Sequence, residues 1–481
     1  MTEYEKSLIT KTFAELNPDD AARILGQIAD SKRILEVLSL IPKSDEEYNN
    51  NTEEFLVKYG INLSKAEADF LVKPSDPEEK MRILKTNDID KMPESFFRYR
   101  QFMANKVIMR DKIRDELCVP DNETVKKWRA RQVLRCDGEL GGLNKSFVHT
   151  VACYELSTGC SVGCKFCGLS AGKLSKLFRY TPENEILFKG VLKKCHEIFG
   201  DAAGFGMMYL ATEPLDNPDY EQFENLFYEE FHIIPQITTA IADRNIERTR
   251  RCLAELNKGK GYIHRFTVRS LEMAERIFQS FSATELLFTE LIPQYPQAPG
   301  FIPYVKVGRE NEDENISPIQ DAEQGTICCV DGICVNFPDK HFRLISPCRV
   351  SEENPKGIIE SENICFEDAE DFERKLRSFI EDNMKNSVPK NEILSLYDFY
   401  YLKEDGKKTI LKSRYGDGLQ LNAEYMITVV KMLMEGKYTR DEIVREISSR
   451  KVVPSENVYW FINKLWDRGI IRENILFCLQ R

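Results

Sequence analysis

The first part of the chain shows the spacing of apolar residues that is typical of amphipathic helices. In residues 1–115 apolar side chains recur every three or four positions, as in segments 21–28 and 34–38. This spacing predicts a helical N-terminal region. Nothing in the region points to a particular chemistry, so we interpret it as a helical layer packed against the domain that follows.

The pattern changes between residues 148 and 348, where short β-rich runs alternate with amphipathic segments of helical length. Strands separated by helices are typical of parallel βα units, whose functional residues gather at the C-terminal ends of the strands. We therefore predict an α/β fold with a βα barrel, or part of one, in a domain of residues 116–375. The predicted strands are residues 148–154, 206–211, 234–239, 264–268 and 285–290, and the predicted helices include 185–192 and 246–253.

Residues 390–481 form a third predicted unit. Two short β-like runs, 400–402 and 410–412, flank a turn of sequence Glu-Asp-Gly, which indicates a hairpin. Three segments with helical spacing follow, and a Gly-Ile-Ile sequence predicts a stop and a last strand. A hairpin with three short helices predicts a winged-helix arrangement. The three helical segments are 423–434, 439–448 and 457–468.

Length and charge narrow the class of protein. The 481 residues fit about three domains. The formal net charge of -11 argues against a surface that holds polyanions, so we expect no nucleic-acid partner and interpret the basic segment 126–131 as a solvated helix face. No stretch approaches the roughly 20 apolar residues of a membrane span, and the first residues are too polar for a secretory signal. We therefore expect a soluble cytoplasmic protein with no membrane partner.

Fourteen cysteines are too few for a disulfide scaffold in a chain of this length, and most are expected to be free thiols or ligands. Cys160, Cys164 and Cys167 follow the first predicted strand directly, among glycines that allow the backbone to wrap a compact object. Thiolates are the ligands of iron-sulfur clusters and zinc. Zinc in a structural site takes a fourth protein ligand, whereas three cysteines around a cubane leave one iron open.

This C-x3-C-x2-C loop, with Phe166 just before the third cysteine, resembles the signature of the radical S-adenosylmethionine superfamily. In that family the loop binds a [4Fe-4S] cluster whose free iron chelates S-adenosylmethionine, and one electron then releases a 5'-deoxyadenosyl radical. The resemblance implies a partial TIM-like (β/α) barrel, one metal-binding [4Fe-4S] site formed by Cys160, Cys164 and Cys167, and S-adenosylmethionine beside Phe166. It also implies an external one-electron reductant, delivered by a protein such as flavodoxin or ferredoxin.

Two further segments fall where the family places cofactor contacts. Segment 211–214, Ala-Thr-Glu-Pro, resembles the family's Gly-Gly-Glu-Pro, which implies that Glu213 accepts a hydrogen bond from the methionyl ammonium. Both glycines of the family motif are replaced here. Segment 268–270 ends the fourth predicted strand, and the resemblance implies Arg269 for the cofactor carboxylate and Ser270 for the ribose. An exposed arginine at a strand end is the alternative for Arg269.

The C-terminal unit resembles the precursor-recognition winged helix of enzymes that mature ribosomal peptides. The resemblance is carried by segments 418–424, 434–439 and 465–471. It implies that the leader of a precursor peptide binds as an added strand beside the hairpin. A DNA-binding winged helix is the alternative, although the segment is not notably basic.

Segments 155–168 and 342–348 look like those of radical S-adenosylmethionine epimerases that convert L- to D-residues in proteusin-type peptides, and the resemblance covers about residues 95–475. It implies an isomerase that removes an α-hydrogen with the deoxyadenosyl radical and returns a hydrogen atom from a cysteine thiol on the opposite face. A cysteine with the reference pKa of about 8.5 is a neutral S–H group at neutral pH. Cys348 matches the family's donor region, and three other cysteines remain alternatives: Cys328, Cys329 and Cys334.

Two other functions stay open from the sequence. The cysteines between residues 328 and 365 could hold an auxiliary cluster, which would favour a peptide crosslinking enzyme, although their spacing does not match the usual compact pattern. The third possibility is a non-catalytic iron-sulfur protein that binds peptides or acts as a sensor. The five cysteines concerned are Cys328, Cys329, Cys334, Cys348 and Cys365.

Overall fold

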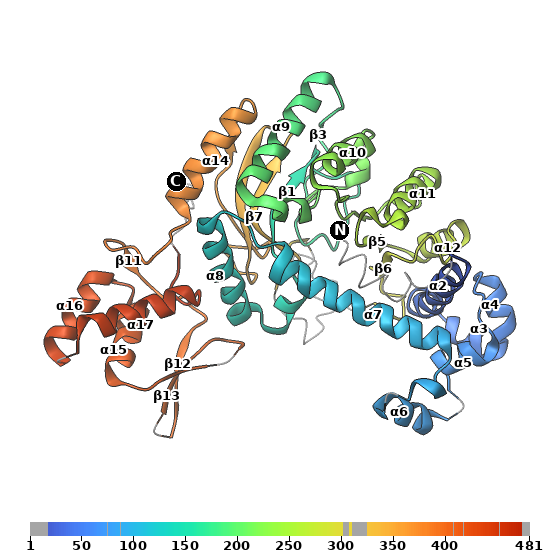
Figure 1. Ribbon diagram of the computed structural model, residues 1–481, viewed down its shortest axis with the longest axis horizontal. Coiled ribbons are helices and arrows are strands. Elements are labelled where there is room, and N and C mark those ends of the chain that lie inside the picture. The colour runs from blue at the N-terminus through green and yellow to red at the C-terminus, as the bar shows by residue number, and fades with distance from the viewer. Residues whose placement is uncertain are drawn as a thin grey trace.

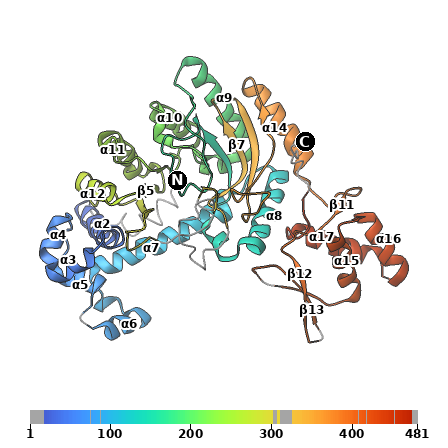
Figure 2. The ribbon, with the colours of Figure 1, turned by 180° about the vertical axis from the view of Figure 1, so that it is seen from behind.

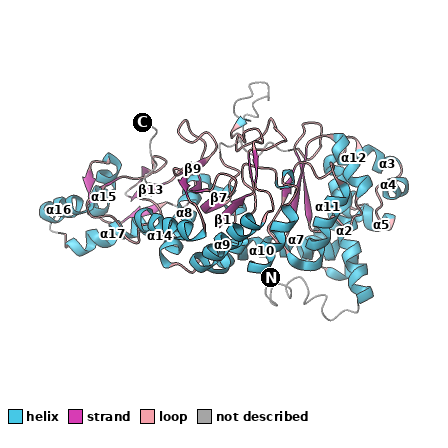
Figure 3. Cartoon of the chain, turned by 90° about the horizontal axis from the view of Figure 1, so that it is seen from above, coloured by secondary structure: helices cyan, strands magenta, loops and turns pink. Residues whose placement is uncertain are grey.

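The computed structural model describes residues 18–74, 76–86, 88–301, 307–309, 325–406, 408–416, 418–451 and 453–473. These residues form a mixed α/β structure (Figure 1). The N-terminal helices lie at one end, the sheets lie at the centre and the C-terminal unit lies at the other end, as the view from behind also shows (Figure 2). Seen from above, the three parts follow one another along the long axis (Figure 3). Residues 1–17 and 474–481 of the predicted outer units lie outside the described residues.

The N-terminal part is helical, as predicted. Its longest helix, α2, unites the two predicted segments, and α7 runs from the N-terminal helices toward the centre (Figure 1). Lys32 and Arg33 of α2 donate hydrogen bonds to main-chain carbonyls of residues 278–289, so this helix is fastened to the following domain by buried cations. The helices are α2 (Pro18–Leu40), α3 (Ser44–Asn50), α4 (Thr52–Lys58), α5 (Lys65–Val72), α6 (Pro77–Thr86), α7 (Glu94–Lys112) and α8 (Glu123–Leu140).

The larger central sheet begins at β1 (Thr150–Glu155), which pairs in parallel with β7 (Val330–Asn336). β8 (His341–Pro347) continues the sheet antiparallel to β7 and pairs in turn with two short strands. β1 and β7 are buried along their whole length, as expected for strands covered on both faces. The two short strands are β9 (Ile358–Glu360) and β10 (Ile364–Cys365), and the helices beside the sheet are α9 (Pro182–Phe199) and α14 (Ala369–Asn383).

A second sheet carries three parallel strands, β4, β5 and β6. Segment 206–211 is not the regular strand that its composition predicts: Met207 makes a single parallel bridge with Cys153, and its carbonyl accepts a hydrogen bond of 2.8 Å from Tyr154 N. Parallel βα units are therefore present, and the described residues show no closed barrel. The elements are β4 (Thr238–Thr239), β5 (His264–Val268), β6 (Thr289–Pro293), α10 (Tyr220–Phe231), α11 (Ile246–Glu255) and α12 (Leu271–Ser280).

The C-terminal unit contains the predicted hairpin and three helices, together with a third strand, β14, that the sequence did not indicate. Ile471, in the predicted last strand, makes only a bridge with Leu396. The winged-helix interpretation stays a prediction. The elements are β11 (Ile393–Leu394), β12 (Tyr401–Asp405), β13 (Lys408–Lys412), β14 (Leu419–Leu421), α15 (Glu424–Glu435), β15 (Tyr438–Thr439), α16 (Arg440–Lys451) and α17 (Ser455–Asp467).

A buried ion pair fastens the C-terminal unit to α8. Arg131 Nε lies 2.7 Å from Glu473 Oε1, and its guanidinium lies 4.8 Å from the ring centre of Trp466. Losing one partner of such a pair would leave an uncompensated charge in the interior.

Across the residues that the structure describes, no helix has the length and apolar character needed to cross a membrane.

Candidate metal and cofactor site

A cavity of about 360 Å³ lies where β4, β5 and β6 end. Thr238 and Ala240 of the β4 end, Thr267 of β5 and Gln294 after β6 line one side. The cysteine loop, which we define as residues 159–168, lines another part. The predicted location at the C-terminal ends of parallel strands is therefore where the structure has its cavity, and the volume falls in the range of small-molecule sites.

Cys160, Cys164 and Cys167 all line this cavity and are partly exposed. The loop is held open by backbone conformations that suit glycine: Gly159 has a φ of 82°, and a Cβ there would lie 2.2 Å from the carbonyl oxygen of Lys173. The loop lies between the short strands β2 (Ser157–Thr158) and β3 (Lys176–Leu177). The backbone conformation at position 159 and the close approach of Lys173 therefore explain why a glycine stands there.

Main-chain amides already point at two of the sulfur atoms. Val162 N lies 3.4 Å from Cys160 Sγ, and Ala171 N lies 3.4 Å from Cys167 Sγ. Hydrogen bonds to cysteine sulfur are a standard feature of iron-sulfur sites. Burial raises the pKa of Cys164 to about 11, and the positive charge of Arg269 opposes that rise. A bound metal would deprotonate such a thiol outright.

The three sulfur atoms of the cysteine loop are not gathered as closely as the ligands of a single bound ion. Within the described part of the chain, the three do not form a set of donors lying within 4.8 Å of one another. Zinc at about 2.3 Å from each sulfur would need sulfur atoms about 3.8 Å apart. The three thiols therefore line the cavity without converging on one point in this structure.

An arginine that the sequence did not single out clamps the cysteine loop. Arg309 N donates to the carbonyl of Cys167 at 3.1 Å, and Arg309 Nη1 donates to the carbonyl of Cys164 at 2.8 Å. The preceding Gly308 has a φ of 58°, and a Cβ there would lie 2.3 Å from the carbonyl oxygen of Gly168. These contacts join positions about 140 residues apart in sequence, so no local pattern could indicate them.

Glu213 is brought to the cavity as predicted, and its carboxylate is almost fully buried. Its oxygens accept hydrogen bonds from Leu215 N at 3.1 Å and from Ala240 N at 2.9 Å. Burial raises the pKa of Glu213 to about 7, and these backbone donors oppose the rise. A cationic ligand in the cavity would favour the ionised form and would itself be bound by it.

The other predicted cofactor contacts are placed differently. Phe166 lines the cavity, whereas Arg269 and Ser270 are not among its lining residues. Arg269 Nε donates to the carbonyl of Ala240 at 2.8 Å, so it supports the strand end that carries the Glu213 contact. Ser270 caps α12 by accepting a hydrogen bond from Met273 N at 3.2 Å. Both residues thus have structural partners in this arrangement.

The remaining cysteines separate into two kinds. Cys328 and Cys329 line the cavity just before β7, whereas Cys348, the predicted donor, is buried outside its lining. Cys365 is exposed on β10, at the far side of β8 from β7. The described structure does not gather these cysteines into one group, so it gives no support to an auxiliary cluster.

Comparisons with known proteins give one clear relative. The chain is 32% identical, over 383 residues, to the uncharacterized protein y4wI of Sinorhizobium fredii (strain NBRC 101917 / NGR234), and the match covers 78% of this chain and 74% of the relative. This chain belongs to the same family as y4wI. No model of a described protein family matches the sequence.

Membership of the y4wI family assigns no activity, because y4wI is itself uncharacterized. Among solved structures, a match was found to BtrN in complex with AdoMet and 2-DOIA, with 18% identity over 30% of this chain and 56% of the BtrN chain. The TM-score is 0.25, which is too low for the likeness to carry an argument about fold or function. The assignment of chemistry therefore depends on the geometry of the cavity.

Proposed function

We propose that the protein is a radical S-adenosylmethionine enzyme that epimerises residues of a ribosomal precursor peptide. The observation that carries this proposal is the meeting of Cys160, Cys164 and Cys167 with Glu213 at one cavity. Three thiols at the edge of one cavity suit a cluster with an open corner, and a buried carboxylate suits an ammonium. The sequence resemblance supplies the specific reaction, L- to D-residue conversion.

The residues of the cavity fit the two cofactors that the proposal requires. Cys160, Cys164 and Cys167 would hold one [4Fe-4S] cluster, and Glu213 would hold the methionyl ammonium of S-adenosylmethionine. When bound and reduced by an external donor, these groups supply the 5'-deoxyadenosyl radical that removes a peptide α-hydrogen. Arg309 holds the cysteine loop through its hydrogen bond to the Cys164 carbonyl, and Leu169, Met207 and Ile292 give the cavity an apolar part of its lining.

The placement of the cysteines changes the proposed hydrogen donor. Cys329 lines the cavity, and burial raises the pKa of its thiol to about 11, so it carries its S–H hydrogen at neutral pH. Cys348 has a raised pKa for the same reason but no place in the lining. We therefore assign hydrogen return to Cys329, one of the alternatives from the sequence, instead of Cys348.

The C-terminal unit supports a peptide as the partner. β12 is an edge strand of the sheet β12-β13-β14, and most of its side chains are exposed. An edge strand offers unpaired N–H and C=O groups, which an extended leader peptide can use as an added strand. The contact between Arg131 and Glu473 would keep this unit attached to the catalytic domain while the leader is bound.

The test is co-expression with the precursor peptide in deuterated water, followed by mass spectrometry of the peptide. Each inversion should add one mass unit at an identifiable residue, and hydrolysis should yield D-amino acids there. Loss of two hydrogens at a residue pair, or a thioether, would contradict the proposal and indicate a crosslinking enzyme.

A matched pair of variants tests the donor. Cys329→Ala should still form 5'-deoxyadenosine with the peptide but yield no deuterated D-residue, whereas Cys348→Ala should epimerise at a rate close to that of the unmodified protein. The reverse result would restore the donor role predicted for Cys348.

A further inference from the structure

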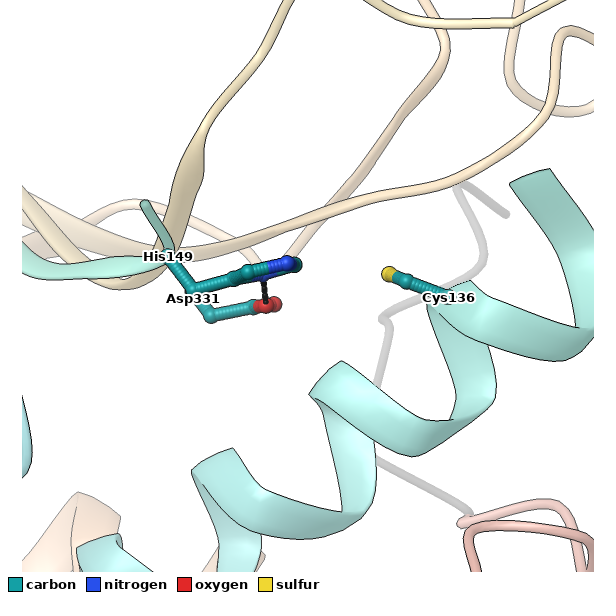
Figure 4. Close-up of side chains that lie close together, drawn as sticks. All are labelled: Cys136, His149 and Asp331. Atoms are coloured by element: carbon teal, nitrogen blue, oxygen red, sulfur yellow. Dashed lines mark hydrogen bonds and ion pairs between the residues drawn. The ribbon is translucent and has the colours of Figure 1, made fainter. Parts of the chain in front are cut away.

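A second group of metal-ligating side chains lies outside the cavity, between α8 and the central sheet. Cys136 comes from α8, His149 from the residue before β1, and Asp331 from β7. Their donor atoms all lie within 4.8 Å of one another, and each of the three residues is 0% exposed. Figure 4 shows the thiol of Cys136 pointing from its helix toward the paired His149 and Asp331 side chains. We call these three residues the buried donor cluster.

We propose that the buried donor cluster binds one structural Zn²⁺ ion. Thiolate, imidazole and carboxylate are the three ligand types that protein zinc sites use. In a tetrahedral site the ligand atoms lie about 3.2–3.8 Å apart, so the hydrogen-bonded His149 and Asp331 side chains must separate, and the Cys136 side chain must adjust, to admit the ion. The carbonyl oxygen of Pro347, which is 3.5 Å from Cys136 Sγ and also accepts a hydrogen bond from Arg135 Nη2, supplies the fourth ligand.

The outer hydrogen bonds of a zinc site are already in place. His149 Nε2 lies 2.8 Å from Asn144 Oδ1, and Asn144 Nδ2 donates to Asp137 Oδ1 at 2.7 Å, which fixes the orientation of the amide. Nε2 therefore carries the hydrogen and Nδ1 faces Asp331, with which it is hydrogen-bonded. A ligating histidine that donates its other N–H to an oxygen is the usual arrangement around protein-bound metals.

The carboxylate and thiol have similar support. Ser346 Oγ donates to Asp331 Oδ1, so Oδ2 remains for the metal. Arg135 Nη2 lies 3.4 Å from Cys136 Sγ and also donates to Ser346 Oγ at 2.8 Å. This cation favours the thiolate, and the charge of Zn²⁺ is balanced by one thiolate and one carboxylate. Binding releases the Sγ proton of Cys136 and the proton shared between His149 Nδ1 and Asp331 Oδ2 to solvent.

The ion would tie together three segments that meet at the cavity wall. Thr150 N, next to His149, donates to the carbonyl of Cys329 at 3.0 Å, and Asp331 is two residues beyond Cys329. α8 also carries Arg131, which contacts the C-terminal unit. A zinc ion at the buried donor cluster would therefore fix α8 against the strands that carry the cavity cysteines. It acts through positioning and touches no substrate.

The metal content of the purified holoprotein tests the proposal. After dialysis against a chelator and inductively coupled plasma mass spectrometry, we expect about one zinc ion per chain beside about four iron atoms. Cys136→Ser and Asp331→Asn should each lose the zinc and keep the iron. Cys195→Ser, which removes a buried thiol of α9 outside the cluster, should keep both metals. Absence of zinc from the unmodified protein, or its retention in Cys136→Ser, would overturn the proposal.

A second measurement covers the case in which those variants do not fold. The Cys160→Ala, Cys164→Ala, Cys167→Ala triple variant lacks the iron-sulfur absorption, and its zinc can be exchanged for Co²⁺. A thiolate-to-cobalt charge-transfer band is expected, and its absence would contradict a cysteine-ligated ion. Zinc that stays in this triple variant also separates the two proposals, since the radical chemistry would then be lost while the zinc site remains.

Discussion

The cysteine loop and the buried donor cluster both gather metal-ligating side chains, but the first does so at the edge of a cavity and the second inside the packed interior. The loop takes its three thiols from eight consecutive residues, leaves them partly exposed and does not gather them into a convergent donor group. The buried donor cluster takes its ligands from positions 136, 149 and 331, and they converge within 4.8 Å. An open site suits reaction with a ligand, whereas a closed, convergent site suits structural support.

The largest expected effect comes from removing a thiol of the loop. Cys164→Ala should lose most of the iron and lower the rate of 5'-deoxyadenosine formation by at least about 10³-fold, because one ligand of three is gone. Zinc content should stay unchanged. The measurement is metal analysis together with liquid chromatography of the reaction products, with Cys195→Ala as the matched control. Equal loss of zinc and iron would show that the two sites are not independent.

The second-largest expected effect comes from removing Arg135, the cation that supports the buried donor cluster. Arg135 is 1% exposed, forms an ion pair with Glu139, and donates to the carbonyl of Pro347 at 2.6 Å. Arg135→Met leaves the buried Glu139 carboxylate without its ion-pair partner and removes one donor to that carbonyl, so we expect a loss of about 3–5 kcal/mol in the free energy of unfolding.

Denaturant titration followed by circular dichroism measures that loss. Arg374→Met is the control, because this side chain is 73% exposed in its ion pair with Asp371 and such pairs contribute at most about 1 kcal/mol. A similar small change in both variants would contradict the account of the Arg135 contacts.

A smaller effect concerns Glu224 of α10, a buried acid away from both sites. Burial raises its pKa to about 8, and its Oε1 has no hydrogen-bond partner among the described residues. The unfolded chain ionises this group near its ordinary pKa, so its contribution to stability falls as pH rises from about 4.5 to about 8. Glu224→Gln should flatten that decline by about 2 kcal/mol between pH 6 and pH 8. Unfolding curves of both proteins at pH 6 and pH 8 measure this difference. An equal fall in the free energy of unfolding for Glu224→Gln and for the unmodified protein would refute the prediction.

The smallest expected effect is on cofactor affinity. With a pKa of about 7, Glu213 gains a proton as the pH falls below neutrality and loses its attraction for an ammonium. The dissociation constant of S-adenosylmethionine for the cluster-containing protein should rise by up to about tenfold from pH 8 to pH 6. Glu213→Gln should bind weakly at both pH values. Equilibrium dialysis measures this, and a variant with the same pH dependence as the unmodified protein would exclude Glu213 as the ammonium partner.

The comparison also shows which features the sequence could predict. Cys160, Cys164, Cys167 and Glu213 were singled out from local motifs and line one cavity, and the β-rich run 264–268 coincides with strand β5. Segment 206–211 looked equally strand-like but forms only one bridge, since pairing depends on neighbours that propensity does not describe. The local motifs survive because a loop of eight residues carries its own geometry.

The contacts that the sequence could not indicate all join distant segments. Arg309 reaches the cysteine loop across about 140 positions, and Asp331 reaches His149 across about 180. Cys348 was chosen by resemblance, whereas Cys329 lines the cavity, and no sequence pattern says which of two cysteines at the ends of neighbouring strands faces a cavity. Contacts between distant segments, and the choice of which cysteine lines the cavity, depend on strand register and packing. A single sequence does not specify these.

The most direct test of the central claim is the fate of S-adenosylmethionine on the reconstituted protein. Incubated anaerobically with dithionite, protein that contains about four iron atoms per chain should convert S-adenosylmethionine into 5'-deoxyadenosine and methionine. Protein with the same iron content that leaves S-adenosylmethionine intact, with and without the precursor peptide, would contradict the claim that the open corner of this site performs radical chemistry.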